Sequence, residues 1–245
     1  MTAAGIIPAR YRASRFPGKA LTPIAGVPMI QRVWEGASRA KHLRTAIVAT
    51  DDDRIASVCR EFGAEVAMTN PDHRTGTDRL AEVAAGLQDE IVVNIQGDEP
   101  LIDGWVVDTA IEALLEDPQP SMSTVVHRAN PENVDDPNRI KVVLDRKSDA
   151  LYFSRSRIPA QSNLNIPARY WQHVGLYAYR KSFLLEFAGL EQTSAELAEQ
   201  LEQLRALENG HRIRCAVIEG WQSISVDVPD DIALVESALR ESSRC

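Results

Sequence analysis

The chain has few cysteines and no long hydrophobic segment. Its 245 residues include three cysteines, Cys59, Cys215 and Cys245, which lie far apart in the sequence. This pattern excludes a disulfide framework and a zinc motif, so we expect two buried thiols and one in a frayed tail. No apolar run approaches the roughly 20 residues that a bilayer-crossing helix needs. No basic stretch precedes an apolar one near Met1 either. We therefore expect a cytoplasmic protein that does not contact membranes.

The chain also lacks net positive charge. It has 27 lysines and arginines against 35 aspartates and glutamates, which gives a formal net charge of -8 at pH 7. Because the overall field repels phosphate, this balance argues against nonspecific binding to nucleic acid or to anionic membranes. A local cluster of cations is compatible with it.

The first half of the chain alternates apolar runs with helical patterns. Buried strands are predicted to end near Ile7 and to cover 45–50 and 90–96, with helices over 28–40, 51–63 and 75–87. This order predicts a parallel sheet with helices on both faces. Hydrophobic residues make up 44% of the chain, which is enough for a sizeable core.

The second half has more strands and fewer helices. Strands are predicted over 122–128, 139–145, 150–155, 173–180 and 212–219, a loop or arm over 160–170, and helices over 194–210 and 229–241. In the first of these helices, Ser194 can cap the start and Gly210 can end it. We expect a mixed sheet here, and a single domain over 1–245 with a lobe near 140–180.

A basic segment, IPARYRASRFPGK, follows the first predicted strand at residues 7–19. Arginine forks and a lysine suit phosphate oxygens, but a solvated basic loop has the same composition. The segment is no P-loop, because Ala20 follows Gly18-Lys19 and no glycine has the required upstream spacing. The chain has no G-x-G-x-x-G motif either.

Two carboxylates follow other predicted strands. Asp98 lies in NIQGDEP (94–100) after Gly97, and Asp227 lies in SISVDVPDDI (223–232) at the end of a predicted short strand. Since ligands of open α/β sheets bind outside the carboxyl ends of the strands, we expect these carboxylates to meet the basic segment there. One or two carboxylates with substrate phosphates suit Mg²⁺. Each aspartate alone could equally cap the helix that follows it.

Several stretches together resemble one family. They are ARYRASRFPGKAL, VATDDDRI, RTGTDRLAEV, NIQGDEPLI, ALYFSRSRIP, HVGLYAYR, EQLEQLRALENG and VDVPDD. Their order is similar to that in the CMP-Kdo synthetases, the 3-deoxy-manno-octulosonate (Kdo) cytidylyltransferases. The resemblance runs through nearly the whole chain. It implies a three-layer nucleotidyltransferase (Rossmann-like) α/β fold with a mixed, mostly parallel sheet and a smaller sugar-binding and dimerisation lobe.

The resemblance also implies an activity and its residues. The family transfers CMP from CTP to the anomeric hydroxyl of Kdo for lipopolysaccharide biosynthesis, with Mg²⁺ as cofactor and as a homodimer. CTP would be bound by Arg10, Ser14, Arg15, Lys19, Gly76 and Thr77. Lys19, Asp98 and Asp227 would be catalytic, and both aspartates would hold the metal. Kdo would be bound by Arg79, Gln96, Arg157, His173, Tyr177, Glu202 and Gln203.

Each of these residues also fits an ordinary structural role. His173 and Tyr177 could be half-buried strand residues on one face, Arg157 a surface cation, and Glu202 and Gln203 the polar face of a helix. Alternative functions are a glycosyltransferase, which would release no pyrophosphate, and a non-catalytic nucleotide-binding module. The two aspartates argue against the second of these.

Three departures from the family pattern leave the exact sugar open. Ala13 stands where a serine is usual, Val228 where a threonine is usual, and TSAEL replaces the usual Pro-Leu start of the helix near 194. SRFPGK, ATDDDRI and YFSRSRIP also resemble the branch that acts on the 8-amino analogue of Kdo. A related sugar acid such as a sialic acid is a further alternative.

Overall fold

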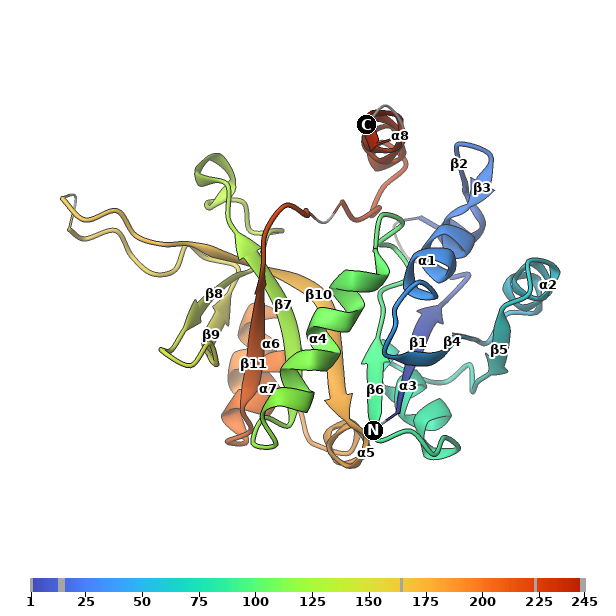
Figure 1. The fold of residues 1–245 in the computed structure, drawn as a ribbon, viewed down its shortest axis with the longest axis horizontal. Coiled ribbons are helices and arrows are strands. Elements are labelled where there is room, and N and C mark those ends of the chain that lie inside the picture. Colours follow the sequence, from blue (N-terminus) through green and yellow to red (C-terminus); the bar gives the residue numbers. More distant parts are fainter. Residues whose placement is uncertain (1, 13–15, 164, 223, 243–245) are drawn as a thin grey trace. The chain divides into compact units, whose positions relative to one another are not determined.

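The computed structural model describes residues 2–12, 16–163, 165–222 and 224–242. The chain forms two compact units (Figure 1). The first contains Met1–Asp108 and Ser223–Cys245, and the second contains Thr109–Gln222. Helix α4 (Gly104–Glu116) contains the first boundary between them. No helix among the described residues is both long and apolar enough to span a membrane.

The first unit has a parallel sheet of four strands in the order β6-β1-β4-β5. Their bounds are β1 Ala3–Ala9, β4 Leu43–Thr50, β5 Glu65–Met68 and β6 Ile91–Asn94. Neighbouring residues of β1, such as Ile6 and Ile7, are both fully buried although they point to opposite faces. Both faces of the sheet are therefore covered, as the sequence predicts.

The helices of the first unit are α1 (Met29–Ala37), α2 (Asp53–Glu61), α3 (Gly76–Ala85) and α8 (Asp231–Ser242), with a 3-10 turn η1 (Lys19–Leu21) and a small hairpin, β2 (Pro23–Ile24) and β3 (Val27–Pro28). Of these helices, α2 and α3 begin at capping side chains. The Asp52 carboxylate accepts from the Arg54 backbone N–H and starts α2. Thr75 and Asp78 form a capping box that starts α3.

The strand order reverses beside β1. From β1 the chain moves to β4 and then β5, and it returns past β1 to form β6 on the other side. The carboxyl ends of β1 and β6 therefore flank a topological switch point, where open α/β sheets bind ligands. The segments that leave these two strands contain Arg10 and Asp98.

The second unit has a mixed sheet. Its strands are β7 (Met122–Arg128), β8 (Lys141–Leu144), β9 (Ala150–Ser154), β10 (Trp171–Arg180) and β11 (Ile213–Ile218). Strand β7 pairs with β10 antiparallel and with β11 parallel, while β8 joins β10 to β9. The predicted change to a mixed sheet and all five predicted strands are confirmed. The described residues of 160–170 contain no helix or strand, as expected.

The helices of the second unit correct one prediction. They are α5 (Lys181–Ala188), α6 (Ser194–Glu199) and α7 (Gln203–Glu208), with a 3-10 turn η2 (Pro131–Asn133). The single helix predicted over 194–210 is wrong, because Gln200 adopts a left-handed conformation with φ 54° and splits it. Thr193, rather than Ser194, forms the capping box with Glu196. Arg205 then pairs with Glu196 at 2.5 Å inside the unit and holds α7 against α6.

A second prediction is also wrong, since residues 224–226 form no strand. This segment is held instead by a backbone hydrogen bond from the Val226 N–H to the Asp98 carbonyl, 2.9 Å long. Val226 packs with Ile24, Met29 and Val235 in an apolar cluster of the first unit.

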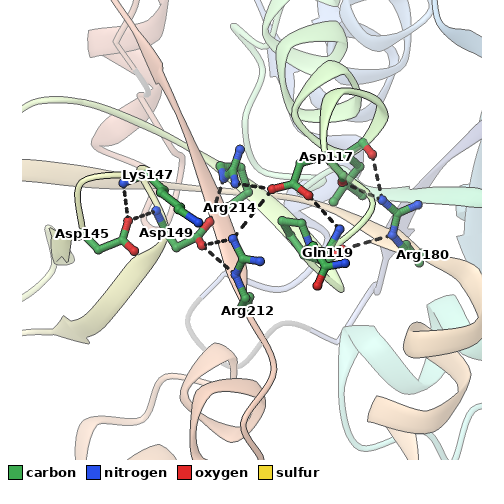
Figure 2. Close-up of polar contacts among 10 residues, drawn as sticks. Asp117, Gln119, Asp145, Lys147, Asp149, Arg180, Arg212 and Arg214 are labelled. Carbon is green, nitrogen blue, oxygen red and sulfur yellow. Dashed lines mark hydrogen bonds and ion pairs between the residues drawn. The ribbon is translucent and has the colours of Figure 1, made fainter.

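Ion pairs join three parts of the second unit (Figure 2). Arg212 and Arg214, at the start of β11, both donate to Asp149 at the turn between β8 and β9, with Nε to oxygen distances of 2.7 Å. Arg214 also donates to Asp117, just after α4, at 2.8 Å. These alternating charges fix β11 to its neighbours.

Candidate active site

A cleft of about 450 Å³ lies in the first unit at the switch point. It has the volume of a typical small-molecule site. Its lining includes residues from the ends of β1 and β6, from the basic segment and from the start of α3. The lining residues are Pro8, Ala9, Arg10, Arg12, Phe16, Lys19, Ala20, Met29, Gly76, Gln96, Gly97, Asp98 and Asp227. Six of the residues predicted to bind substrate or metal therefore share one cavity.

The floor of the cleft depends on a close backbone approach. A β-carbon added to Gly97 would lie 2.9 Å from the carbonyl oxygen of Pro8, which is closer than carbon and oxygen can pack. Only glycine allows the chain leaving β6 to pass so near the end of β1. This contact places Asp98 beside the basic segment.

The basic segment forms a loop closed at its base. The Gly18 N–H donates to the Tyr11 carbonyl at 2.8 Å, and Gly18 has φ 74°, a conformation that favours glycine. The Arg54 guanidinium lies 3.3 Å from the centre of the Tyr11 ring and braces the loop from α2. Ser14 and Arg15, both predicted to bind the nucleotide, lie outside the described residues.

Lys19 is the central cation of the cleft. Its Nζ donates to Asp98 Oδ2 and to the Val226 carbonyl, both at 2.8 Å, and lies 3.9 Å from Asp227 Oδ1. The Lys19 side chain is mostly buried, whereas the two carboxylates keep access to solvent. The predicted meeting of both carboxylates with the basic segment at the strands' carboxyl edge is present in this geometry.

Asp227 is held in place by its backbone. Its N–H donates to the carboxylate of Asp231 at 2.8 Å, in the first turn of α8, and the Val228 N–H donates to the same oxygen at 3.0 Å. Asp231 thus binds the N–H groups that precede this helix. Asp227 itself lines the cleft.

The two carboxylates fit a magnesium ion by donor type. Mg²⁺ takes one or two protein carboxylates and completes its shell with waters and substrate phosphates. Among the described residues, no group of three or more His, Cys, Asp or Glu side chains is arranged to hold a metal alone. An ion bound by Asp98 and Asp227 would therefore need phosphate or water ligands as well.

The other predicted residues of the first unit differ in access. Arg10 donates to the carbonyls of Arg74 and Thr75 at 3.2 and 2.7 Å, next to the start of α3. Thr77 and Arg79, on α3, are buried and are not among the residues lining the cleft. Arg79 is 0% exposed, pairs with Asp51 at 3.0 Å and donates to Thr69. Burial lowers the pKa of its guanidinium, and Asp51 opposes that change.

In the second unit, the structure brings His173 and Tyr177 into contact. Their ring centres are 5.2 Å apart, and the Phe153 ring packs edge-on with His173 at the same distance. Burial lowers the pKa of His173 to about 3, so the ring is neutral at pH 7. Its Nε2 is buried and has no hydrogen-bond partner within the described part of the chain.

Glu202 and Gln203 lie at the start of α7. Burial raises the pKa of Tyr177, and Tyr179 and Glu202 raise it further. The Gln203 Nε2 is buried and, like that of His173, has no hydrogen-bond partner among the residues described. Arg157 lies in the loop after β9, where its Nε donates to the Tyr170 hydroxyl at 2.8 Å and its Nη1 lies 3.6 Å from Asp135.

The sequence did not lead us to predict a role for two polar residues of the second unit, Tyr170 and Thr124. Tyr170 orients Arg157, and Thr124 on β7 donates to carbonyls of β10. The only signal for Thr124 is a pair of hydroxyl residues, Ser123 and Thr124, next to two valines in the same strand.

Comparisons with known proteins agree with this architecture. A family profile described as Cytidylyltransferase matches residues 4–213. A curated 3-deoxy-manno-octulosonate cytidylyltransferase from Syntrophotalea carbinolica is 50% identical over 250 residues, covering 98% of this chain and 99% of its own. Another, from Geobacter sulfurreducens, is 49% identical and covers 98% of this chain and 100% of its own.

Solved structures of similar proteins have the same fold as this chain. A structure described as CMP:2-keto-3-deoxy-manno-octonic acid synthetase complexed with CTP superposes with a TM-score of 0.94 at 40% identity, over 99% of this chain and 100% of that one. A cytidylyltransferase from Leptospira borgpetersenii, 16% identical with a TM-score of 0.67, shares the fold. The nucleotidyltransferase fold predicted from the sequence is therefore confirmed, and the chain belongs to the 3-deoxy-manno-octulosonate cytidylyltransferase family.

Proposed function

We propose that this protein transfers CMP from CTP to the anomeric hydroxyl of Kdo and releases pyrophosphate. The observation that carries the proposal is Lys19, held between Asp98 and Asp227 in a nucleotide-sized cleft at the switch point. A cation and two carboxylates at one edge suit a triphosphate with its metal. Curated relatives are named for this activity, and a solved relative is described as complexed with CTP.

The reaction needs no protein nucleophile. The sugar hydroxyl oxygen attacks the α-phosphorus of CTP, a new oxygen-phosphorus bond forms, and the bond to the bridging oxygen breaks. Pyrophosphate leaves with the electrons of that bond, and the hydroxyl proton passes to water. Such in-line displacement depends mostly on positioning and on electrostatic stabilisation. Lys19 would contact the phosphates, with Arg10 and the N-terminus of α3 nearby.

Asp98 and Asp227 would hold Mg²⁺ together with phosphate oxygens. When bound, the ion would offset the negative charge of the triphosphate. The Lys19 ammonium, which lies between the two carboxylates, also screens them from each other. We therefore expect Lys19 to turn toward the phosphates when nucleotide and metal arrive.

The sugar acid would be bound by polar groups that the nucleotide does not need. Arg157 would meet the sugar carboxylate with its planar fork. His173, Tyr177, Glu202 and Gln203 would bind hydroxyls, and the buried nitrogens of His173 and Gln203 support this assignment. Gln96, which lines the cleft, would bind sugar from the first unit. For Arg79, we propose a contact with the sugar only if substrate reorganises its pair with Asp51.

Pyrophosphate release tests the proposal. The purified protein is incubated with CTP and Kdo, and release is measured with and without Mg²⁺. We expect turnover with CTP and much less with UTP, TTP or GTP. Parallel reactions with 8-amino-Kdo and a sialic acid identify the sugar. Binding of CTP without release with any sugar acid would favour a non-catalytic nucleotide-binding module instead.

We also propose a homodimer that acts in the cytoplasm, in lipopolysaccharide biosynthesis. Among the described residues, β9 pairs with β8 alone and is an edge strand, and its Leu151 is 60% exposed. Exposed edges with apolar side chains are commonly covered by a partner. Size-exclusion chromatography with light scattering would find twice the chain mass, and Leu151→Glu would shift the protein toward a monomer.

A further inference from the structure

Strand β10 contains a bulge between two residues assigned to the sugar acid. His173 is paired with Val126 of β7 and Tyr177 with Thr124, so four steps along β10 correspond to two along β7. The extra residues lie between Val174 and Tyr177. Four residues of regular strand span about 13 Å, yet the rings of His173 and Tyr177 are centred 5.2 Å apart.

Both rings lie on one face of the sheet, because two extra residues leave the alternation of side chains unchanged. Residues directly opposite each other in an antiparallel pair point to the same side, and Val126 and Thr124 lie two apart on β7. His173 and Tyr177 therefore share the face of Thr124. Ser123 points to the opposite face, where its hydroxyl donates to the Ala110 carbonyl of α4.

The Thr124 hydroxyl contacts the backbone just before the extra residues and at one of them. Its Oγ1 lies 2.7 Å from the Leu176 carbonyl oxygen and 3.1 Å from that of Val174. Thr124 is 0% exposed, and Val174 and Leu176 are buried as well. In such surroundings a carbonyl that loses a donor is costly, because water cannot replace it.

We propose that Thr124 is a positioning residue for the sugar-acid site, whose hydroxyl holds the β10 bulge and so places His173 beside Tyr177. Thr124 does not touch the substrate. It acts through the backbone at 174–176, and bulges near functional sites often aim side chains in this way. The inference rests on the proposed function for its effect on the sugar, but the bulge itself can be tested without substrate.

The test compares Thr124→Val, which removes the hydroxyl and keeps the shape, with Thr124→Ser, which keeps the hydroxyl. We expect Thr124→Val to raise the KM for Kdo about tenfold or more, since displacements near 1 Å in a site have effects up to about 100-fold. The KM for CTP should stay within about twofold of the wild type, by the same reasoning. Thr124→Ser should restore the wild-type KM for Kdo.

Ser123→Ala is the matched control. It removes an equally buried hydroxyl from the neighbouring position on the same strand, but on the face toward α4. We expect it to lower the melting temperature about as much as Thr124→Val does, and to leave the KM for Kdo unchanged. Equal increases of this KM in both variants would overturn the proposal, because general loosening of β7 would then explain them.

Nuclear magnetic resonance tests the bulge directly. The chain has five histidines, and His173→Gln identifies the His173 ring signals by their loss. Because the rings of Phe153 and Tyr177 are each centred 5.2 Å from the His173 ring, the ring-proton shifts of His173 report their arrangement. We expect Thr124→Val to change these shifts and Ser123→Ala to leave them unchanged. Wild-type shifts in Thr124→Val would overturn the proposal.

Changed shifts without a raised KM for Kdo would likewise exclude a role in sugar binding. Thr124→Ala is the second variant if Thr124→Val does not fold. Failure of both to fold would overturn the proposal, because the hydroxyl would then be a general requirement of the fold. A wild-type protein inactive with CTP and Kdo would contradict the proposed function, while the shifts would still decide whether Thr124 holds the bulge.

Discussion

The polar groups of the two units differ in how they are paired. In the first unit, Lys19 already contacts Asp98, and Arg10 contacts carbonyls beside α3. In the second unit, the buried nitrogens of His173 and Gln203 have no hydrogen-bond partner within the described ranges. Under the proposed function, the phosphates would thus meet a site whose cation is already held by counter-charges, whereas the sugar hydroxyls would meet groups whose hydrogen bonds a ligand can complete.

The largest effect is expected where the internal counter-charges are removed. Asp98→Asn and Asp227→Asn should each lower Mg²⁺-dependent pyrophosphate release by at least about 100-fold, as losses of single electrostatic contacts to a transition state do. The double variant should be little worse than either single one, because residues that act as a unit are not additive. Release is measured across a magnesium titration, with thermal melts to exclude unfolding.

Asp230→Asn is the control for this pair, since Asp230 is exposed, lies three residues after Asp227 and is not part of the cleft lining. It should keep full activity. Full activity in Asp227→Asn at ordinary magnesium would remove Asp227 from the metal site and leave Asp98 as its only protein ligand.

Lys19→Ala should have the next largest effect. The loss of a charge-assisted phosphate contact costs about 2–3 kcal/mol, which lowers kcat/KM for CTP by about 30- to 150-fold. Lys41→Ala, at an exposed lysine, should leave it unchanged. If Lys19→Ala keeps the wild-type kcat/KM, the pairing with Asp98 is structural only.

Arg157→Ala should weaken the binding of one substrate and leave the binding of the other unchanged. It should weaken Kdo binding about tenfold or more, as expected for a charged hydrogen bond, while CTP binding stays near the wild-type value. Calorimetric titration with each ligand separately measures both. Arg169→Ala, an exposed arginine in the same loop, is the control. Equal losses for both ligands would contradict this division of substrates between the units.

The smallest expected effect is on how the free energy of unfolding depends on pH. The folded pKa of His173 is about 3, and an unfolded histidine titrates near 6.5. Between these values the unfolded chain binds more protons, so His173 lowers the free energy of unfolding as the pH falls from about 6.5 toward 3. Urea unfolding at pH 7 and pH 5 should show a smaller decrease in His173→Gln than in the wild type, by about 1–2 kcal/mol.

His127 is the comparator for that experiment, because burial lowers its pKa as well. His127→Gln should remove its own share of the pH dependence and leave the share of His173. An unchanged pH dependence in His173→Gln would mean that the ring is accessible to protons in the folded protein.

The sequence allowed the sheet and the cleft to be predicted because their signals are local. Strand β7 matches the predicted range of 122–128, and the capping residue Thr75 correctly places the start of α3. The rule for carboxyl edges then placed Lys19 and Asp98 together. Asp227 joins them from a segment that is not the predicted strand. These features depend on the spacing of hydrophobic residues, on capping residues and on the order of the strands, each of which can be recognised in short segments of the sequence.

What could not be predicted depends on contacts between distant residues. The spacing of leucines in 194–210 fits one helix as well as two. The structure has two helices, because Gln200 adopts a left-handed conformation and the ion pair between Glu196 and Arg205 holds the helices together. The face shared by His173 and Tyr177 follows from their spacing. Their contact does not, because the bulge needs a hydroxyl from another strand.

The first unit is built from both ends of the chain, and this has a consequence for synthesis. Asp227 and Val226 are translated on the order of ten seconds after Asp98, at ordinary ribosome speeds. Until then, the nascent chain lacks the carbonyl that binds Lys19 and the residues that pack on Ile24 and Met29. A ribosome that stops after residue 222 would release the second unit whole and the first with an uncovered apolar cluster. Quality-control proteases would therefore meet stalled products whose cleft at the switch point is defective.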